Sequence, residues 1–138
     1  MTAGGFEARC GCGDLTVLVS GLPVLQVVCH CNDCREVTGE PFTRVVFFPL
    51  VGIATRGATH TTEFFGASGN TKHYVSCARC DEFLYGEVAV LGGVCGIRPR
   101  SLGPKFTFAP SAHVWVSQRD STVHLDDDLP AFERAPGR

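Results

Sequence analysis

The sequence predicts a mainly β fold in a single domain that spans residues 1–138. Short runs of β-branched and aromatic residues alternate with turn residues along most of the chain, which is typical of an all-β protein. Sixteen glycines and eight prolines fit many short connections better than long helices. With 138 residues, of which 44% are hydrophobic, the chain can bury one core and is too short for two ordinary domains.

The strands are expected between clusters of Gly, Pro, Ser and Asn. In chain order they are residues 15–19, 24–28, 44–48, 62–65, 72–76, 83–91, 106–108, 112–117 and 122–125. One short helix is expected at residues 32–38, because Gly39 can supply the left-handed residue that ends a helix.

Charge and hydropathy argue against several classes of function. The formal net charge of −2 is unsuited to a protein that holds nucleic acid through phosphate contacts. No apolar run approaches the roughly 18 residues that span a bilayer. Residues 1–13 (MTAGGFEARCGCG) lack the basic and apolar regions of a secretory signal. We therefore expect a cytoplasmic protein without nucleic-acid or membrane partners, whose oligomeric state the sequence leaves open.

The eight cysteines carry most of the functional information. Seven lie in tight clusters and one stands alone: Cys10 and Cys12; Cys29, Cys31 and Cys34; Cys77 and Cys80; and Cys95. Cysteines one residue apart rarely bridge each other, because a disulfide needs narrowly defined Cα distances and Cβ directions. A disulfide framework also needs an oxidising compartment. The spacing favours metal binding instead, with zinc as the expected ion and an iron–sulfur cluster as the rival.

The clustered cysteines divide into two sites of different character. The four-sulfur cluster is Cys10, Cys12, Cys77 and Cys80. Four thiolates close a structural zinc site, which here would connect the N-terminal hairpin to the middle of the chain. The three-sulfur cluster is Cys29, Cys31 and Cys34. Three ligands leave a fourth position open, as a catalytic zinc requires.

The remaining cysteine, the histidines, Arg35 and an acidic run are less strongly indicated as functional residues. Cys95 could complete the three-sulfur cluster and make both sites structural, but we expect a small buried hydrophobic residue. His30 should point away from the metal, because alternate residues of an extended segment face opposite ways. Arg35 could offset thiolate charge, bind a substrate carboxylate or be an ordinary solvated side chain. Structural or surface positions are expected for His60, His73, His113, His124 and the acidic run 126–128.

Three cysteine motifs occur in an order that resembles a known family. They are residues 11–13 (GCG), 29–35 (CHCNDCR) with Gly39 shortly after, and 77–80 (CARC). On these motifs the sequence resembles the glutathione-dependent formaldehyde-activating (GFA) family, which also includes centromere protein V.

The likeness extends over nearly the whole chain, with two departures. Residues 110–116 (PSAHVWV) and 128–132 (DLPAF) look like the C-terminal elements of that family. Asp81 stands where Gly usually follows the second CxxC, and residues 97–102 (IRPRSL) replace a usual Leu-Asp-Asp. If the second segment helps to shape the substrate pocket, the substrate differs from the one in the family's name.

The resemblance implies a fold and a reaction. The fold is a single zinc-binding domain of several twisted antiparallel sheets, shared with a small family of zinc-binding nucleotide-release chaperones. The four-sulfur cluster matches the structural zinc ligands, and the three-sulfur cluster matches the ligands of a second, catalytic zinc. The family's reaction condenses glutathione with formaldehyde to S-hydroxymethylglutathione, which is a carbon–sulfur lyase reaction written in reverse.

A mechanism follows from these expectations. Zinc at Cys29, Cys31 and Cys34 would bind the substrate thiol at its open position and keep it deprotonated. The thiolate would then attack the carbonyl carbon of a small aldehyde. Because three thiolates make zinc electron-rich, this second ion is expected to be a poor Lewis acid and weakly held. The rival functions are a non-catalytic, zinc-stabilised binding module and a thiol or metal redox sensor.

Overall fold

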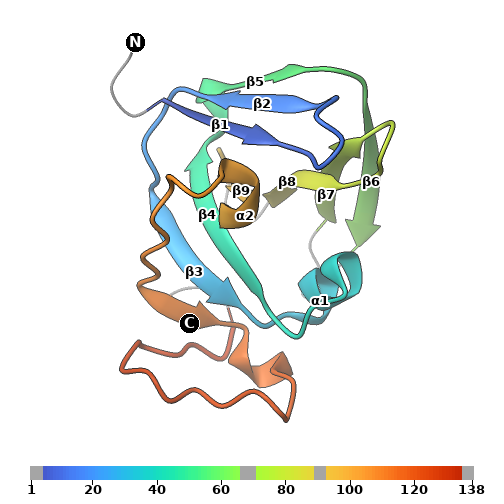
Figure 1. Cartoon of the computed structure of the whole chain (residues 1–138). Coiled ribbons are helices and arrows are strands. Elements are labelled where there is room, and N and C mark those ends of the chain that lie inside the picture. Colours follow the sequence, from blue (N-terminus) through green and yellow to red (C-terminus); the bar gives the residue numbers. More distant parts are fainter. Residues whose placement is uncertain (1–4, 66–70, 89–92, 135–138) are drawn as a thin grey trace.

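The structure, a computed structural model, describes residues 5–65, 71–88 and 93–134 (Figure 1). The strands are β1 Phe6–Arg9, β2 Thr16–Val19, β3 Leu25–Cys29, β4 Thr43–Pro49, β5 Ile53–Arg56, β6 Thr59–Phe65, β7 Thr71–Cys77, β8 Phe83–Val88, β9 Val94–Ile97 and β10 Ala112–Val114. The helices are α1 Asn32–Thr38 and α2 Pro99–Leu102, with 3₁₀ turns at η1 Leu50–Gly52 and η3 Val116–Gln118. One sheet has the order β1-β2-β5, and the other has the order β10-β3-β4-β9-β8-β7-β6. The prediction of a mainly β fold is confirmed.

The three-stranded sheet covers the larger of two hydrophobic cores. β1 and β2 form an antiparallel hairpin, and β5 pairs antiparallel with the other side of β2. Val17 and Val19 of β2 are buried, because successive side chains of a strand point to opposite faces. They pack in one cluster with Phe48, Leu84 and Ile97 from the second sheet. This packing holds the N-terminal hairpin against the rest of the protein.

β4 contributes to the cores on both faces of the seven-stranded sheet. Val46 and Phe48 belong to the larger core, whereas Val45 and Phe47 pack against a second cluster. The buried residues of that second cluster are Val27, Cys29, Cys31 and Val114. Two cysteines of the three-sulfur cluster are therefore buried against one face of this sheet.

The pairing of β10 departs from the expected antiparallel sheets. β10 lies parallel to β3, with Ala112 opposite Val27 and Val114 opposite Cys29. It is the orange arrow beside β3 in Figure 1. The other strand pairs of the described residues are antiparallel. The C-terminal part of the chain thus lies alongside the strand that ends at Cys29.

The strand prediction is wrong for residues 106–108 and 122–125, neither of which forms a strand, and for residues 115–117, where β10 has ended and a 3₁₀ turn begins. Phe106 and Phe108 pack against the larger core from irregular backbone. The Thr122 amide and hydroxyl both donate to Asp120 Oδ1, at 2.8 and 2.6 Å, and form a local turn. The structure also contains β1, β5, β9 and α2, which the sequence pattern does not predict. The predicted continuation of β8 to residue 91 lies outside the described residues.

α1 begins and ends where the sequence predicts. Cys31 caps its N-terminus, where its Sγ accepts a hydrogen bond from the Cys34 amide at 3.3 Å. Gly39 ends it with a left-handed φ of 72°, and its amide donates to Arg35 O at 2.8 Å. The capping bond brings Cys31 and Cys34 to the same end of the helix. Neither α1 nor α2, the α-helices of the described residues, is long and apolar enough to cross a membrane.

Candidate metal centre

The four-sulfur cluster forms where two turns of the chain meet. Cys10 and Cys12 lie between β1 and β2, and Cys77 and Cys80 lie where β7 turns towards β8. All four Sγ atoms lie within 4.8 Å of one another. The Cys12 Sγ is 3.5 Å from that of Cys10 and 3.7 Å from that of Cys77. Tetrahedral sulfurs about 2.3 Å from a zinc ion lie about 3.8 Å apart, so these residues fit a closed thiolate site.

Backbone amides favour thiolates in this cluster. The Leu15 amide donates to Cys10 Sγ at 3.3 Å, and the Arg79 and Cys80 amides donate to Cys77 Sγ at 3.4 and 3.5 Å. Hydrogen bonds to a charged form stabilise that form. Burial opposes ionisation of Cys10, but the Leu15 amide and the neighbouring thiols outweigh it and lower the pKa of Cys10 to about 6.

Asp81 closes the turn that carries Cys77 and Cys80. Its φ of 65° lies in the left-handed region, which Asp tolerates better than most residues other than Gly. The Asp81 amide donates to Cys77 O at 2.9 Å, and the Cys77 amide donates to Glu82 O at 2.9 Å. His60 contacts the Asp81 carboxylate from β6. The turn therefore forms although Asp stands where the family resemblance leads one to expect Gly.

The three-sulfur cluster lies at the junction of β3 and α1. The Cys29 Sγ is 3.4 Å from that of Cys31 and 3.7 Å from that of Cys34. All three Sγ atoms lie within 4.8 Å of one another. Cys29 and Cys31 are buried and Cys34 is partly exposed. The arrangement fits three positions of a tetrahedral metal site and leaves one position for another ligand.

A buried ion pair, which sequence reasoning missed, adjoins this cluster. Lys72 Nζ of β7 lies 2.9 Å from Asp33 Oδ2 and 3.9 Å from Cys31 Sγ. The two charged side chains are only 8% and 10% exposed. A buried ammonium group loses its hydration, so it needs partners of opposite charge. The signal in the sequence is the alternation of β7, which places Lys72 on the same buried face as Tyr74 and Ser76.

The pKa values of the three thiols shift in different directions, and the pKa of Lys72 shifts with them. Hydrogen bonds with Cys29 and Cys34 lower the pKa of Cys31, and the charge of Lys72 acts in the same direction. The contact with Cys31 raises the pKa of Cys29 against an opposing effect of Cys34, and the contacts with Cys29 and Cys31 raise the pKa of Cys34. Burial works against the ammonium group, but the charge of Cys31 and the Asp33 carboxylate raise the pKa of Lys72. The protein groups therefore favour one thiolate at Cys31, and a bound cation is needed to keep all three sulfurs deprotonated.

Cys95 and Arg35 lie outside the two clusters. Cys95 is fully buried in the larger core, and burial raises the pKa of Cys95 to about 12. It is positioned as a small hydrophobic residue and does not complete the three-sulfur cluster. Arg35 donates to Gln118 O at 2.7 Å and lies 3.6 Å from Asp120. These contacts tie α1 to the C-terminal segment.

His30 is fully buried and takes part in a chain of polar contacts. Its Nε2 lies 2.9 Å from His113 Nδ1, and His113 Nε2 lies 2.9 Å from Asp127 Oδ2. Because the Asp127 carboxylate accepts from His113, a neutral His113 accepts at Nδ1 from His30. Cys29 and Cys31 face the second core, so alternation directs His30 to the other side of the strand, as predicted. Within the acidic run, Asp127 is thus a structural hydrogen-bond acceptor.

A cavity of about 320 Å³ lies beside α1. Its walls include Val37, Thr38, Tyr74 and Arg98. Arg98, from the segment that departs from the family pattern, is nearly buried and donates to Phe83 O at 3.2 Å. Burial, followed by the charges of the three-sulfur cluster, raises the pKa of Tyr74. The cavity wall is therefore within electrostatic reach of that cluster.

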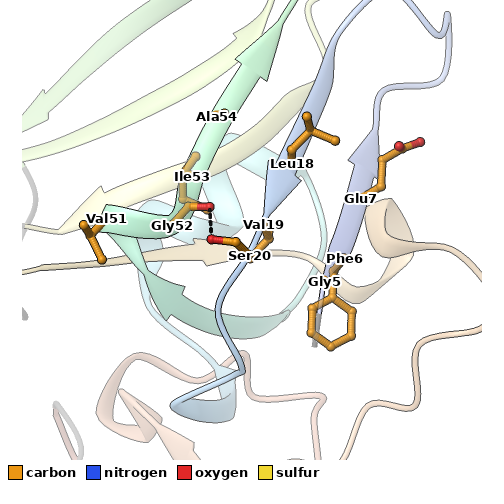
Figure 2. Close-up of a pocket in the computed structure, with 10 residues that line it drawn as sticks. All are labelled: Gly5, Phe6, Glu7, Leu18, Val19, Ser20, Val51, Gly52, Ile53 and Ala54. Carbon is orange, nitrogen blue, oxygen red and sulfur yellow. Dashed lines mark hydrogen bonds between the residues drawn. The ribbon is translucent and has the colours of Figure 1, made fainter. Parts of the chain in front are cut away.

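A wider groove of about 590 Å³ lies on the three-stranded sheet (Figure 2). It is lined by residues of β1, β2, η1 and β5, and Glu7 is the charged residue among them. The Ser20 hydroxyl donates to Gly52 O across it at 3.2 Å, and Val51 is almost wholly exposed at its edge. Because the described residues of this lining include no Cys, His, Lys or Arg, they offer neither thiolates to a metal ion nor cations to an anionic substrate.

Comparisons with known proteins agree with the cysteine geometry. The profile of the family described as glutathione-dependent formaldehyde-activating enzyme (GFA) matches residues 5–118. Among solved structures, the chain is similar to the crystal structure of a Rhodobacter sphaeroides protein from a structural-genomics programme, with 18% sequence identity and a TM-score of 0.58. The match covers 72% of this chain and 90% of that one, and it supports a shared fold alone. No curated protein matches the sequence. The family profile covers most of the chain, including both cysteine clusters, and the protein belongs to the GFA family.

Proposed function

We propose that the protein is a zinc-dependent enzyme of the carbon–sulfur lyase type. It would condense a thiol, either glutathione or a similar compound, with formaldehyde or another small aldehyde. The observation that carries the proposal is the three-sulfur cluster, which combines two buried sulfurs and a partly exposed one. The other four clustered sulfurs suffice for a separate, closed site. Of the two, the three-sulfur cluster can offer a position to a substrate.

Zinc suits the donor sets of both clusters. Thiolates are soft ligands that select zinc among the common divalent cations, and the sulfur spacings match a tetrahedral ion. Cys10, Cys12, Cys77 and Cys80 would hold a structural zinc. Cys29, Cys31 and Cys34 would hold a second zinc, which supplies a position where a substrate thiol stays deprotonated near neutral pH.

The surrounding residues have separate tasks in this proposal. The three cysteines fix where the substrate sulfur lies. Thr38, Tyr74 and Arg98 line the cavity beside α1, which would hold the remainder of the thiol compound. A carboxylate of glutathione would meet the guanidinium of Arg98 there, in competition with Glu40 and Glu82, which lie 3.6 and 3.8 Å from it. The binding partners of the proposed enzyme are thus a small thiol and a small aldehyde.

The reaction itself moves one proton from sulfur to oxygen and forms one carbon–sulfur bond. The thiol loses its proton, and its sulfur forms a bond to the aldehyde carbon. The π electron pair of the carbonyl moves to the oxygen, which then takes up a proton. The sulfur must react as a thiolate, and the developing negative oxygen needs a donor nearby.

NMR exchange spectroscopy on formaldehyde and glutathione tests the proposal. The zinc-loaded wild-type protein should exchange free and thiol-bound formaldehyde faster than buffer, and Cys31→Ser should return the rate to that of buffer. Cys95→Ala, which removes a buried sulfur outside both clusters, should keep the wild-type rate. If wild type and Cys31→Ser both match buffer, the proposed reaction is wrong. Metal analysis adds a check: two zinc ions per chain are expected, and a single tightly bound ion would favour a non-catalytic binding module.

A further inference from the structure

A buried charge lies against the three-sulfur cluster. We propose that Lys72 is a positioning residue that lets this cluster accept an anionic fourth ligand, a thiolate, in preference to a neutral one. The inference rests on the proposed function, because it assigns the basis on which the same site selects its thiol substrate. Its structural basis is the Lys72 ammonium, 3.9 Å from Cys31 Sγ and held at 2.9 Å by the Asp33 carboxylate.

The charge of the site explains why a cation is needed there. Three thiolates and one divalent cation leave one net negative charge. A thiolate as fourth ligand raises this to two, whereas a neutral ligand such as imidazole adds none. Cys29 and Cys31 are buried, and negative charge collected in a buried place is costly unless a positive group accompanies it. Lys72 supplies that positive group.

Cys31 is the sulfur through which Lys72 acts. Its Sγ accepts a hydrogen bond from the Cys34 amide at 3.3 Å and faces the Lys72 ammonium. Both groups stabilise negative charge on this sulfur, because hydrogen bonds and nearby cations favour its charged form. Electron density held by these groups is less available for donation to a bound metal. Lys72 therefore counteracts the electron-rich character that three thiolate ligands would otherwise give the ion.

Asp33 holds Lys72 in place and opposes it electrostatically. Asp33→Asn keeps an oxygen acceptor for the ammonium group but removes the negative charge. The neighbourhood of Cys31 then becomes more positive, whereas in Lys72→Met it becomes more negative. The two substitutions should consequently change thiolate binding in opposite directions. Simple loss of packing would weaken binding in both.

The test is a ligand titration of the full chain loaded with Co²⁺, whose thiolate charge-transfer absorption changes when a further sulfur binds. The probes are 2-mercaptoethanol, which binds as an anion, and imidazole, which binds as a neutral ligand. Lys72→Met should weaken 2-mercaptoethanol binding at least tenfold, which corresponds to about 1.4 kcal/mol, and leave imidazole binding within about twofold of wild type. Lys72→Arg should restore thiol binding, and Asp33→Asn should strengthen it.

Lys105→Met is the matched control, since Lys105 is the chain's other lysine and is exposed. It should titrate like wild type with both probes. The inference is overturned if Lys72→Met binds 2-mercaptoethanol like wild type, or if Lys72→Met and Asp33→Asn weaken both probes alike. If Lys72→Met holds no cobalt, the Lys72→Arg and Asp33→Asn titrations decide. A wild-type protein that binds no thiol overturns the proposed function as well, whereas thiol binding that ignores Lys72 overturns this inference alone.

Discussion

Cys77→Ser should remove most of the protein's folding stability. Cys77 is fully buried in the larger core, and its Sγ lies 3.7 Å from that of Cys12 in the N-terminal hairpin. Serine replaces one of four sulfurs with a poorer ligand and leaves three thiolates around an incomplete site. Because a structural metal site contributes its binding free energy to folding, the loss should appear directly in the free energy of unfolding.

The separation of the two cysteines sets the size of the effect. Cys12 and Cys77 are 65 positions apart in the chain. Cross-linking a loop of this length removes roughly 4 kcal/mol of unfolded-state entropy at 25 °C. A domain of ordinary stability unfolds at a cost of about 5–15 kcal/mol. Loss of the cross-link alone thus removes between a quarter and most of the stability, before any lost metal–sulfur bonding is added.

Urea unfolding of zinc-loaded protein, followed by circular dichroism with and without a chelator, measures this loss. The chelator should destabilise wild type by roughly 4 kcal/mol or more and should have little further effect on Cys77→Ser. Cys95→Ala is the matched control, because Cys95 is equally buried in the same core but belongs to neither cluster. It should cost only about 1 kcal/mol and keep the full chelator response. A Cys77→Ser protein that unfolds at the wild-type midpoint would refute the reasoning.

Three further predictions concern the framework. Phe48→Ala, at a fully buried position of the larger core, should cost about 3–5 kcal/mol in urea unfolding; a loss below about 1 kcal/mol would contradict this packing. Gly57→Ala places a Cβ 2.1 Å from a backbone oxygen at a φ of 110°, whereas the Cβ in Gly39→Ala meets nothing within 4 Å. Gly57→Ala should therefore lower Tm far more, and equal shifts would argue against this backbone. The hydrogen bond from His113 lowers the pKa of Asp127 below its usual value of 3.8. The stability that this bond gives the fold is therefore present above pH 3.8 and is lost as the pH falls through the lowered pKa. Asp127→Asn should consequently have a lower Tm than Asp128→Asn at pH 7, and the gap should close in acid.

The parts of the fold that sequence reasoning found are those with local causes. α1 was predictable because Gly39, which ends it, adjoins the helix in the sequence. β4 and β7 were predictable because β-branched and aromatic residues fill them.

The strands that were missed depend on distant partners. β9 has four residues, two of them the small Cys95 and Gly96, and it forms a strand because β4 and β8 pair with it on both sides. A Cβ at Gly96 would lie 2.7 Å from Val45, so the small residue permits this close pairing. Such pairing leaves little trace in the propensity of the segment itself.

The same distinction holds for the candidate site. The structure brings together the cysteines of each cluster that the spacing suggested. Lys72 and Asp33 escaped notice because they are 39 positions apart in the chain, and β7 must pack beside α1 before they meet. A charged side chain on the buried face of a strand was the one local indication of Lys72. Asp33 gave none, since an acidic residue in the first turn of a helix is ordinary.

The two clusters also differ in when their ligands become available during protein synthesis. The ligands of the three-sulfur cluster lie between residues 29 and 34 and are synthesised together, before Cys77 is added. The four-sulfur cluster cannot form until Cys80 has been made. The pair Cys10 and Cys12 must then meet the pair Cys77 and Cys80, which closes a long loop of the chain. A nascent chain therefore presents the three-sulfur ligands first. The four-sulfur cluster, which joins the N-terminal hairpin to the turn between β7 and β8, becomes complete only after more than half of the chain has been made.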